Sequence, residues 1–599
     1  MAGLQADRDI VAGLAEAEHD EFEHKKLAAH SSDDHSDEID TVHDGLEFPT
    51  EEEKLTLRRV SDTLPWSAYL IATCELAERF SYYGCTVVYT NFLQQPLPKG
   101  STTGASLDQA GALGLGQRAS TGIITFNNFW AYVIPLFGAY VADTYWGRYK
   151  TICVAVAVAL VGHVLLIVSA VPGVISHPHN ALGCFMIAII IIGIGTGSFK
   201  SNVSPLVAEQ YKRTKLFIGH TKSGERVIVD PIMTVSRIYM YFYMFINIGA
   251  LVGQISMVYA EKYVGFWLAF TLPTVVFLIS PLVLFIGRNR YVTSAPQGSV
   301  LGKSFRILRQ AAKGRWSINP VKTIKNMNAA DFWEGAKPSN FTGESRPRWM
   351  TFDDQWVDEV RRGFKASSVF CWIPIYWLTY NQLNNNLTSQ AAAMNTHGLP
   401  NDILSNLDPF ALLIFIPVCD QLLYPALRRA GINLTPLKKI TLGFFLGSGA
   451  MVWAAVVQHY IYKTSPCGYA AATCTDADGN PLTSPLNVWI QTGAYVLIAL
   501  SEIFTSITGL EYAFTKAPKN MRSLVVGVFF FMSALSAALG EAFVALSEDP
   551  LLVWNYGVMA VLAFLAGTGF WFQYRSLDAE EEALNHLGEK PAAPEKEKH

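Results

Sequence analysis

The chain has 599 residues, of which 50% are hydrophobic and only 16% are charged. Average soluble domains carry roughly 25% charged residues. A chain this apolar cannot hide its surface inside an ordinary water-soluble globule, so we expect a lipid bilayer to surround it. The small formal net charge of −4 offers no electrostatic footprint for nucleic acid, and we expect no nucleic-acid partner.

The two ends of the chain are polar. Residues 1–65 are acidic, rich in histidine and poor in large apolar side chains, which is typical of a disordered tail. They contain no basic stretch followed by an apolar core, so no cleaved signal peptide is predicted. Residues 576–599 form a second polar tail.

Between the tails, twelve stretches hold the roughly 20 mainly apolar residues that a membrane-spanning helix needs. They lie at about 68–93, 120–142, 150–172, 182–206, 236–260, 265–287, 366–391, 407–428, 437–461, 487–514, 520–546 and 552–574. The sequence therefore predicts an all-α, multi-pass membrane protein with twelve transmembrane helices.

Basic residues mark one side of this predicted membrane protein. The loops after even-numbered spans carry them, for example Arg148 and Lys150 after the second span, whereas the odd-numbered loops are nearly bare. Because basic loops stay in the cytoplasm, both tails and the long loop at 291–364 are predicted to be cytoplasmic. That loop divides the spans into two six-helix bundles, at 66–290 and 365–575, a layout known from transporters.

Two weaker patterns accompany this layout. The cytoplasmic ends of spans 2 and 8, GAYVADTYWGRYK and IPVCDQLLYPALRR, each place an acid before basic residues, a faint internal repeat. Cys467 and Cys474 share a predicted outer loop, where they could form a disulfide or remain free thiols. The glycosylation sequon at Asn433 falls in a predicted cytoplasmic loop, so we expect no glycan there.

Charged residues inside the first span need an explanation. Its segment CELAERFSYYG places Glu75, Glu78, Arg79 and Tyr82 at the i, i+3, i+4, i+7 spacing of one helix face, with Tyr83 beside them. An ionised side chain at the membrane centre costs about 2.5–3.5 kcal/mol on insertion scales. A Glu75–Arg79 pair could simply join helices, but Glu78 then keeps a surplus charge or a proton. We interpret this charged stripe as a functional feature rather than a purely structural one.

Two further ionisable residues lie in other spans. Lys200, in the fourth span, and Glu502, in the tenth, have no opposite charge within one helical turn. Since they belong to different halves, a salt bridge between them could latch the halves together and break when substrate arrives. A purely structural bridge is the alternative.

Aromatic side chains accompany these charges. A shared chamber would contain positive groups, negative groups and the rings of Tyr82, Tyr83, Tyr132 and Trp377. Such a lining suits a zwitterion better than a pure anion or a sugar.

The segment from Glu75 to Gly84 matches the ExxERFxYYG motif and resembles the proton-dependent oligopeptide transporter family of the major facilitator superfamily. GAYVADTYWGRYKTI (138–152) and FYMFINIGAL (242–251) resemble its two signatures. Segments 195–211 and 501–521 resemble its fourth and tenth spans. The likeness covers about residues 66–575 and is closest to the fungal branch.

The resemblance implies import of di- and tripeptides with protons, by two bundles that rock around a central site. Proton coupling would rest on Glu75, Glu78, Arg79 and Glu502. The peptide would be bound by Arg79, Tyr82, Tyr83, Tyr132, Lys200, Asn247, Trp377, Asp408 and Glu502. Arg79 and Lys200 would meet the peptide carboxylate, while Glu502 and Asn247 would meet its amino group. We expect a plasma-membrane monomer that uses no metal and no cofactor except the proton as coupling ion.

Three positions depart from the family pattern. Asn381 stands where many relatives have an acid, and Thr125 stands where animal relatives have a functional histidine. Asp408 stands where bacterial relatives have an asparagine, which adds a negative group to the predicted pocket. Proton coupling is therefore expected to rest on carboxyl groups.

Two other functions remain open from the sequence. A carrier of the same fold could move nitrate or another small solute, although the intact ExxER pattern favours peptides. A membrane receptor that senses peptides is the second alternative. An enzyme is not expected, because no metal-site or nucleophile–base pattern appears in the spans.

Overall fold

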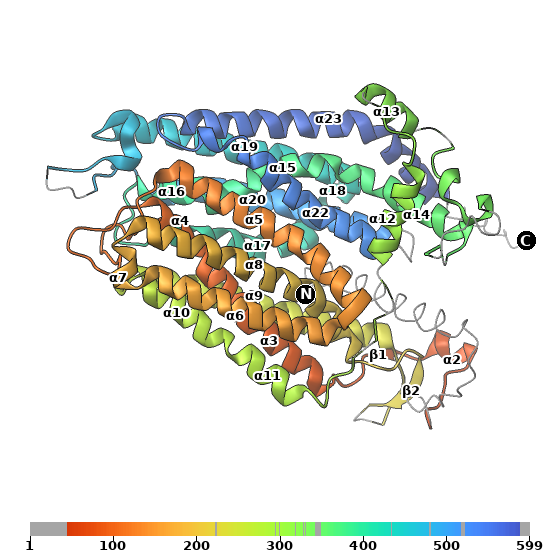
Figure 1. The fold of residues 1–599 in the computed structure, drawn as a ribbon. Coiled ribbons are helices and arrows are strands. Elements are labelled where there is room, and N and C mark those ends of the chain that lie inside the picture. Colours follow the sequence, from red (N-terminus) through yellow and green to blue (C-terminus); the bar gives the residue numbers. More distant parts are fainter. Residues whose placement is uncertain are drawn as a thin grey trace, which may run out of the picture.

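The computed structural model describes residues 45–587 except for short gaps at 222–223, 294, 297, 299, 318, 328, 330, 342–348, 351, 433, 478–480 and 517–521. The predictions for residues 1–44, the Asn433 sequon and residues 588–599 lie outside these described residues. Figure 1 shows long helices running side by side, with those of the first half below those of the second half.

The first half is built mainly from helices. Its elements are α3 (Trp66–Val87), α4 (Tyr89–Gln94), α5 (Gly116–Val141), η1 (Ala142–Trp146), α6 (Arg148–Ala170), α7 (Pro172–Ile175), α8 (Pro178–Glu209), α9 (Pro231–Tyr263), α10 (Phe266–Phe277) and α11 (Ile279–Gly287).

The second half is helical too but more often interrupted. Its elements are η5 (Ser368–Trp372), α15 (Ile373–Tyr380), η6 (Asn381–Asn384), α16 (Asn386–Ala392), η7 (Asn401–Asn406), α17 (Leu407–Val418), η8 (Cys419–Leu423), α18 (Tyr424–Arg429), α19 (Pro436–Thr464), η9 (Gly468–Thr473), η10 (Val488–Gln491), α20 (Thr492–Glu502), η11 (Ile503–Ile507), α21 (Thr508–Lys516), α22 (Arg522–Glu541), η13 (Val544–Leu546) and α23 (Leu552–Leu587). All twelve predicted spans fall on helical segments, and eight helices of the described chain are long and apolar enough to cross a membrane.

The faint internal repeat has a structural counterpart. Spans 2 and 8 each end in a five-residue π-helix, η1 with sequence ADTYW and η8 with sequence CDQLL. The acid that the sequence comparison aligned is the second residue of each. A third π-helix, η11, begins directly after Glu502. Such π-helical turns are rare and often occur at functional sites.

Close packing of α3 against α9 turns the charged face of α3 away from lipid. Gly249 and Gly253 of α9 approach the carbonyl oxygens of Leu76 and Phe80 so closely that an added Cβ would collide with them. Small residues permit this approach between membrane helices. The glycines thus fix the rotation of the helix that carries Glu75, Glu78 and Arg79.

The predicted disorder of the amino-terminal tail is wrong for its last residues. The segment forms α2 (Glu51–Thr56) and β1 (Arg59–Val60), and β1 pairs with β3 (Arg226–Val229), which also pairs with β2 (Phe217–His220). The physical reason is charge: Arg226 binds both Glu47 and Glu53. The acidity that suggested a free tail is therefore matched by a basic loop.

The loop between the two halves is folded as well. It contains α12 (Val300–Ala311), α13 (Pro320–Met327), η2 (Glu334–Ala336), η3 (Pro338–Asn340) and α14 (Asp354–Ser367). Ile307, Phe332, Val357 and Val360 form a small apolar core, with Val528 of α22 packed against it. The loop is thereby attached to the second half.

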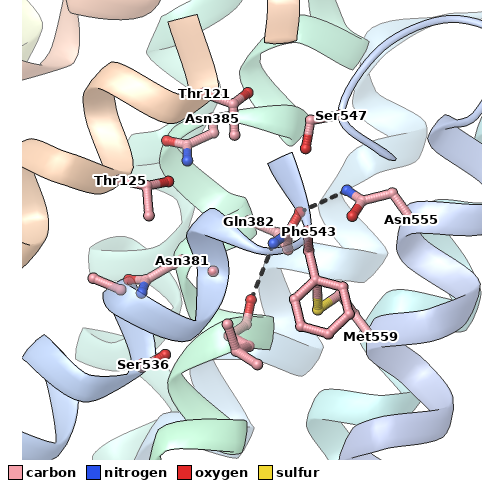
Figure 2. Close-up of a pocket in the computed structure, with 13 residues that line it drawn as sticks. Thr121, Thr125, Asn381, Gln382, Asn385, Ser536, Phe543, Ser547, Asn555 and Met559 are labelled. Carbon is pink, nitrogen blue, oxygen red and sulfur yellow. Dashed lines mark hydrogen bonds between the residues drawn. The ribbon is translucent and has the colours of Figure 1, made fainter. Parts of the chain in front are cut away.

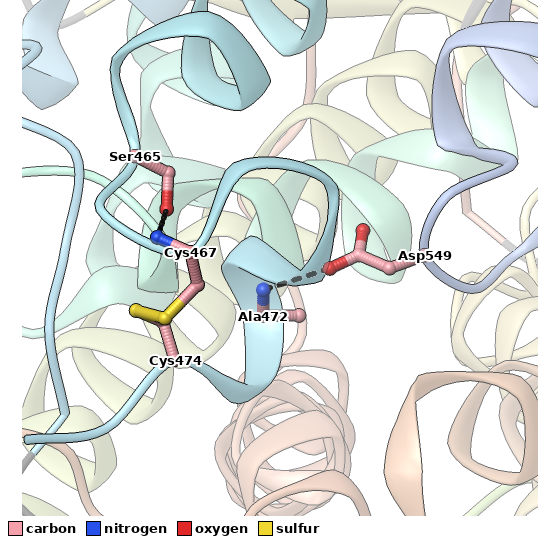
Figure 3. The surroundings of a disulfide bond; sticks show 5 residues. All are labelled: Ser465, Cys467, Ala472, Cys474 and Asp549. Atoms are coloured by element: carbon pink, nitrogen blue, oxygen red, sulfur yellow. Dashed lines mark hydrogen bonds between the residues drawn. A yellow bond between two sulfur atoms is a disulfide. The ribbon is translucent and has the colours of Figure 1, made fainter.

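Cys467 and Cys474 are joined by a disulfide (Figure 3). The same loop is attached to the turn before α23, because the amide of Ala472 donates to Asp549 Oδ2 at 2.8 Å and Tyr462 donates to Asp549 Oδ1 at 2.6 Å. Figure 1 places this loop at the end of the molecule opposite to α2, the sheet and the linker helices. We call these the disulfide end and the tail end.

Candidate functional site

The charged stripe of α3 forms a compact buried cluster. Arg79 Nε lies 2.9 Å from Glu75 Oε1 and 2.7 Å from Glu78 Oε2. The three residues are between 1% and 3% exposed. One guanidinium thus serves two carboxylates. Because burial makes an uncompensated charge costly, the surplus carboxylate is a natural proton acceptor.

Lys200 extends the positive part of this region. Its Nζ lies 4.8 Å from the centre of the Tyr132 ring, and its charge interacts with Arg79 and with both α3 glutamates. Unlike Arg79, the Lys200 side chain is exposed, so it can meet a soluble anion. Tyr82 and Tyr83 adjoin this region, with their rings 5.3 Å apart and edge-on to each other.

The second half contributes a negative cluster. Tyr380 of α15 donates to Asp408 Oδ2 at 3.5 Å and interacts electrostatically with Glu502. The Tyr380 and Trp377 rings meet edge to face at 5.1 Å. Among the described residues, Glu502 Oε2, Asp408 Oδ1 and the Trp377 indole nitrogen have no hydrogen-bond partner. A ligand that hydrogen bonds to such buried, unpartnered polar atoms gains the most binding free energy.

Tyrosines connect the two clusters across the interface between the halves. Tyr132 of the first half interacts electrostatically with Glu502, and also with Arg79. Tyr380 of the second half interacts in the same way with Tyr83. Positive and negative groups from different halves therefore face one region, in the arrangement that a zwitterion needs.

One predicted contact between the two halves is not formed. No ion pair between Lys200 and Glu502 is present in the part of the chain that the structure describes, so the predicted salt bridge is absent here. Lys200 instead lies on Tyr132, and Glu502 interacts electrostatically with Tyr380. Asn247, which is predicted to meet the peptide amino group, is exposed and donates to the Tyr243 carbonyl of its own helix at 2.9 Å.

Comparison with known proteins identifies the family. The model of the POT family matches residues 149–563. The chain belongs to the POT family. It is 42% identical to the peptide transporter PTR_B of Candidozyma auris, over 90% of this chain and 87% of that one. It is 38% identical to the peptide transporter PTR2 of Saccharomyces cerevisiae, over 90% and 84%.

A solved structure shares the POT fold. The crystal structure of the POT family transporter PepTSo superposes with a TM-score of 0.66 at 21% identity, covering 86% of this chain and 99% of that one. The similarity in fold confirms the expected two-bundle class of membrane protein.

Two of the departures from the POT pattern meet in one place. Figure 2 shows a polar cavity of about 20 Å³ between α5 and the second half, and both Thr125 and Asn381 line it. Gln382 receives a hydrogen bond from Asn555 there at 3.1 Å. The two neutral side chains therefore line one cavity. If only one of these positions carried an ionised residue, no lining residue would supply its counter-ion.

Sequence reasoning missed the polar contacts that close the disulfide end. Gln117 of α5 donates to Asn386 of α16 at 3.1 Å, and Asn91 of α4 exchanges hydrogen bonds with Asn401 of η7 at 2.9 and 3.0 Å. The amide-rich run YNQLNNNLTSQ was the available signal. Buried amides need partners, and here the partners come from the opposite half.

Proposed function

We propose that the protein imports di- and tripeptides together with protons, by alternating access of a central site to the two sides of the plasma membrane. One observation carries this proposal: Arg79 and Lys200 lie on the first-half side of the region that Glu502 and Asp408 border from the second half. A dipeptide carries a carboxylate at one end and an ammonium at the other. Each end thus meets opposite charge.

The α3 cluster would couple transport to protons. Glu75 and Glu78 share Arg79 in a site from which water is nearly excluded, so one carboxylate favours a bound proton. The peptide carboxylate brings a negative charge near Arg79 and competes for it. Proton uptake and peptide binding thereby favour each other, which is the requirement for symport.

The disulfide supports the predicted orientation. Disulfides persist in oxidising compartments, and the Cys467–Cys474 bond lies at the end opposite to the basic loops. We therefore infer that the disulfide end faces outward and both tails face the cytoplasm. We also propose that the chain acts as a monomer. The relatives named above are called peptide transporters, which supports peptides over nitrate as cargo.

Uptake in cells tests this function. A host that lacks peptide carriers should accumulate labelled dipeptide faster at an external pH near 5.5 than near 7.5 when it produces this protein. Lys200→Ala and Glu502→Ala should each slow uptake at low peptide concentration. Equal uptake by cells with and without the protein, despite normal surface levels, would refute the proposal.

A further inference from the structure

A pair of buried carboxyl groups lies at the disulfide end, away from the central site. Glu261 is near the end of α9 in the first half, and Asp402 belongs to η7 in the second half. They are 2% and 1% exposed, and their carboxyl groups lie close enough to interact electrostatically. The pair therefore spans the interface between the bundles.

The surrounding residues supply few donors. Asn91 of α4 donates to Glu261 Oε1 at 2.8 Å. Glu261 Oε2 and both oxygens of Asp402 have no donor among the described residues. Two ionised carboxylates accept hydrogen bonds only and would repel each other in this buried setting. A hydrogen bond between them requires a proton on one.

The charged neighbours do not replace that proton. Lys262 donates from Nζ to the carbonyl of Gly398 at 2.8 Å and also interacts with Asp108, an exposed acid of the loop before α5. The phenol of Tyr495, from α20, interacts with Asp402 as well. With three acids and one ammonium, the group keeps an excess of negative charge unless it binds a proton.

We propose that Glu261 and Asp402 form a proton-binding site that holds the outer face of the two bundles closed. The inference rests on the proposed alternating access. A proton from the outer solution binds one carboxylate, and its O–H donates to the other. When the bundles separate at this end, that hydrogen bond breaks, both groups become hydrated and the proton returns to the outer solution. This proton acts on the gate and is not the one carried across.

The sign of the pH effect follows from linkage. The closed state binds the proton more tightly than the open state, so low outer pH favours closure and high pH opens the gate. With one proton involved, the ratio of closed to open molecules falls by up to about tenfold per pH unit within the titrating range.

The distance between the outer ends of the two halves reports this equilibrium without any peptide. Leu107, in the loop before α5, and Trp489, in η10 at the start of the tenth span, are 71% and 49% exposed and belong to different halves, so Leu107→Cys and Trp489→Cys can carry spin labels. Cys153, Cys184 and Cys371 are the accessible free thiols in the described chain and are replaced by serine. Pulsed electron-spin measurements on the purified full-length protein in nanodiscs then give the distance distribution from pH 5 to 9.

We expect a single short distance at pH 5 and a growing longer population as the pH rises. Glu261→Gln and Asp402→Asn each supply a permanent amide donor in place of the proton, so each should hold the short distance at every pH. The control Glu548→Gln removes an exposed carboxylate that also joins the halves, through Arg118 at 3.4 Å, and should keep the response of the unmodified protein.

Three results would overturn the proposal: no pH response in the unmodified protein, an unchanged response in both amide variants, or opening of those variants at low pH. Since either amide variant tests the same hydrogen bond, one that fails to fold leaves the other. A pH-dependent distance in a protein that shows no peptide uptake would refute the proposed cargo and leave the gate standing. Normal uptake with a pH-independent distance would refute the proposed gate and leave the proposed cargo standing.

Discussion

The opposite charges of the central site predict a selective loss of affinity when Lys200 or Glu502 is neutralised. Glu502 Oε2 is buried without a partner, so a peptide ammonium would form a charge-assisted hydrogen bond worth about 1.5–3 kcal/mol. Glu502→Gln should therefore raise the Kd of a dipeptide by roughly 10- to 150-fold. Lys200 is exposed and more screened, and Lys200→Gln should raise the Kd about 5- to 10-fold, for roughly 1–1.4 kcal/mol.

Capped dipeptides separate the contributions of the two charged ends of the ligand. An N-acetylated dipeptide has no ammonium, so Glu502→Gln should leave its Kd nearly unchanged while Lys200→Gln still raises it. A C-amidated dipeptide should show the opposite pattern. Isothermal titration calorimetry of purified protein at one pH and salt concentration measures the Kd of each of the two variants for each of the two capped dipeptides. The exposed Glu541 provides the control Glu541→Gln, which should match the unmodified protein. An equal rise in Kd for intact and capped peptides in both variants would refute the charge assignment.

Three further predictions concern coupling and folding. Glu78→Gln should abolish accumulation against a gradient yet retain peptide exchange, measured by counterflow; normal accumulation would contradict the coupling role of the α3 cluster. Replacing Cys467 and Cys474 by serine should lower the melting temperature with transport retained. The disulfide closes a short loop in the unfolded chain, and this lowers its entropy and stabilises the folded state by roughly 2–3 kcal/mol. An unchanged melting curve would contradict this stabilising role. Gly253→Ala should reduce the folded yield in size-exclusion chromatography, because its Cβ would strike the Phe80 carbonyl, whereas Gly557→Ala, where the added Cβ meets nothing within 4 Å, should not.

The sequence predicted those features that follow from helical spacing. One helix face carries Glu75, Glu78 and Arg79, and the structure brings all three together as ion pairs. Apolar length predicted where helical segments lie, and eight of the described helices are long and apolar enough to cross a membrane, since the bilayer thickness fixes what a helix must contain. These properties are local in the chain, so no knowledge of neighbours was needed.

The features that were missed depend on partners distant in the sequence. Nothing near Glu261 indicates that Asp402 will face it, and a polar residue at a helix end is ordinary on its own. Lys200 and Glu502 were expected to pair because both lacked local partners, but each found a neighbouring tyrosine instead. The strand β1 likewise forms only because residues near Arg226 approach the tail.

The central claim is that proton movement drives peptide import through one shared site. Purified protein in liposomes, with the membrane potential clamped at zero and the outside two pH units more acidic, measures it directly. One proton per peptide allows an inside-to-outside ratio of up to about 100, tenfold for each pH unit. We predict a ratio well above one that falls to one when the pH gradient is removed. A ratio of one under both conditions, in liposomes that still exchange peptide, would contradict the account.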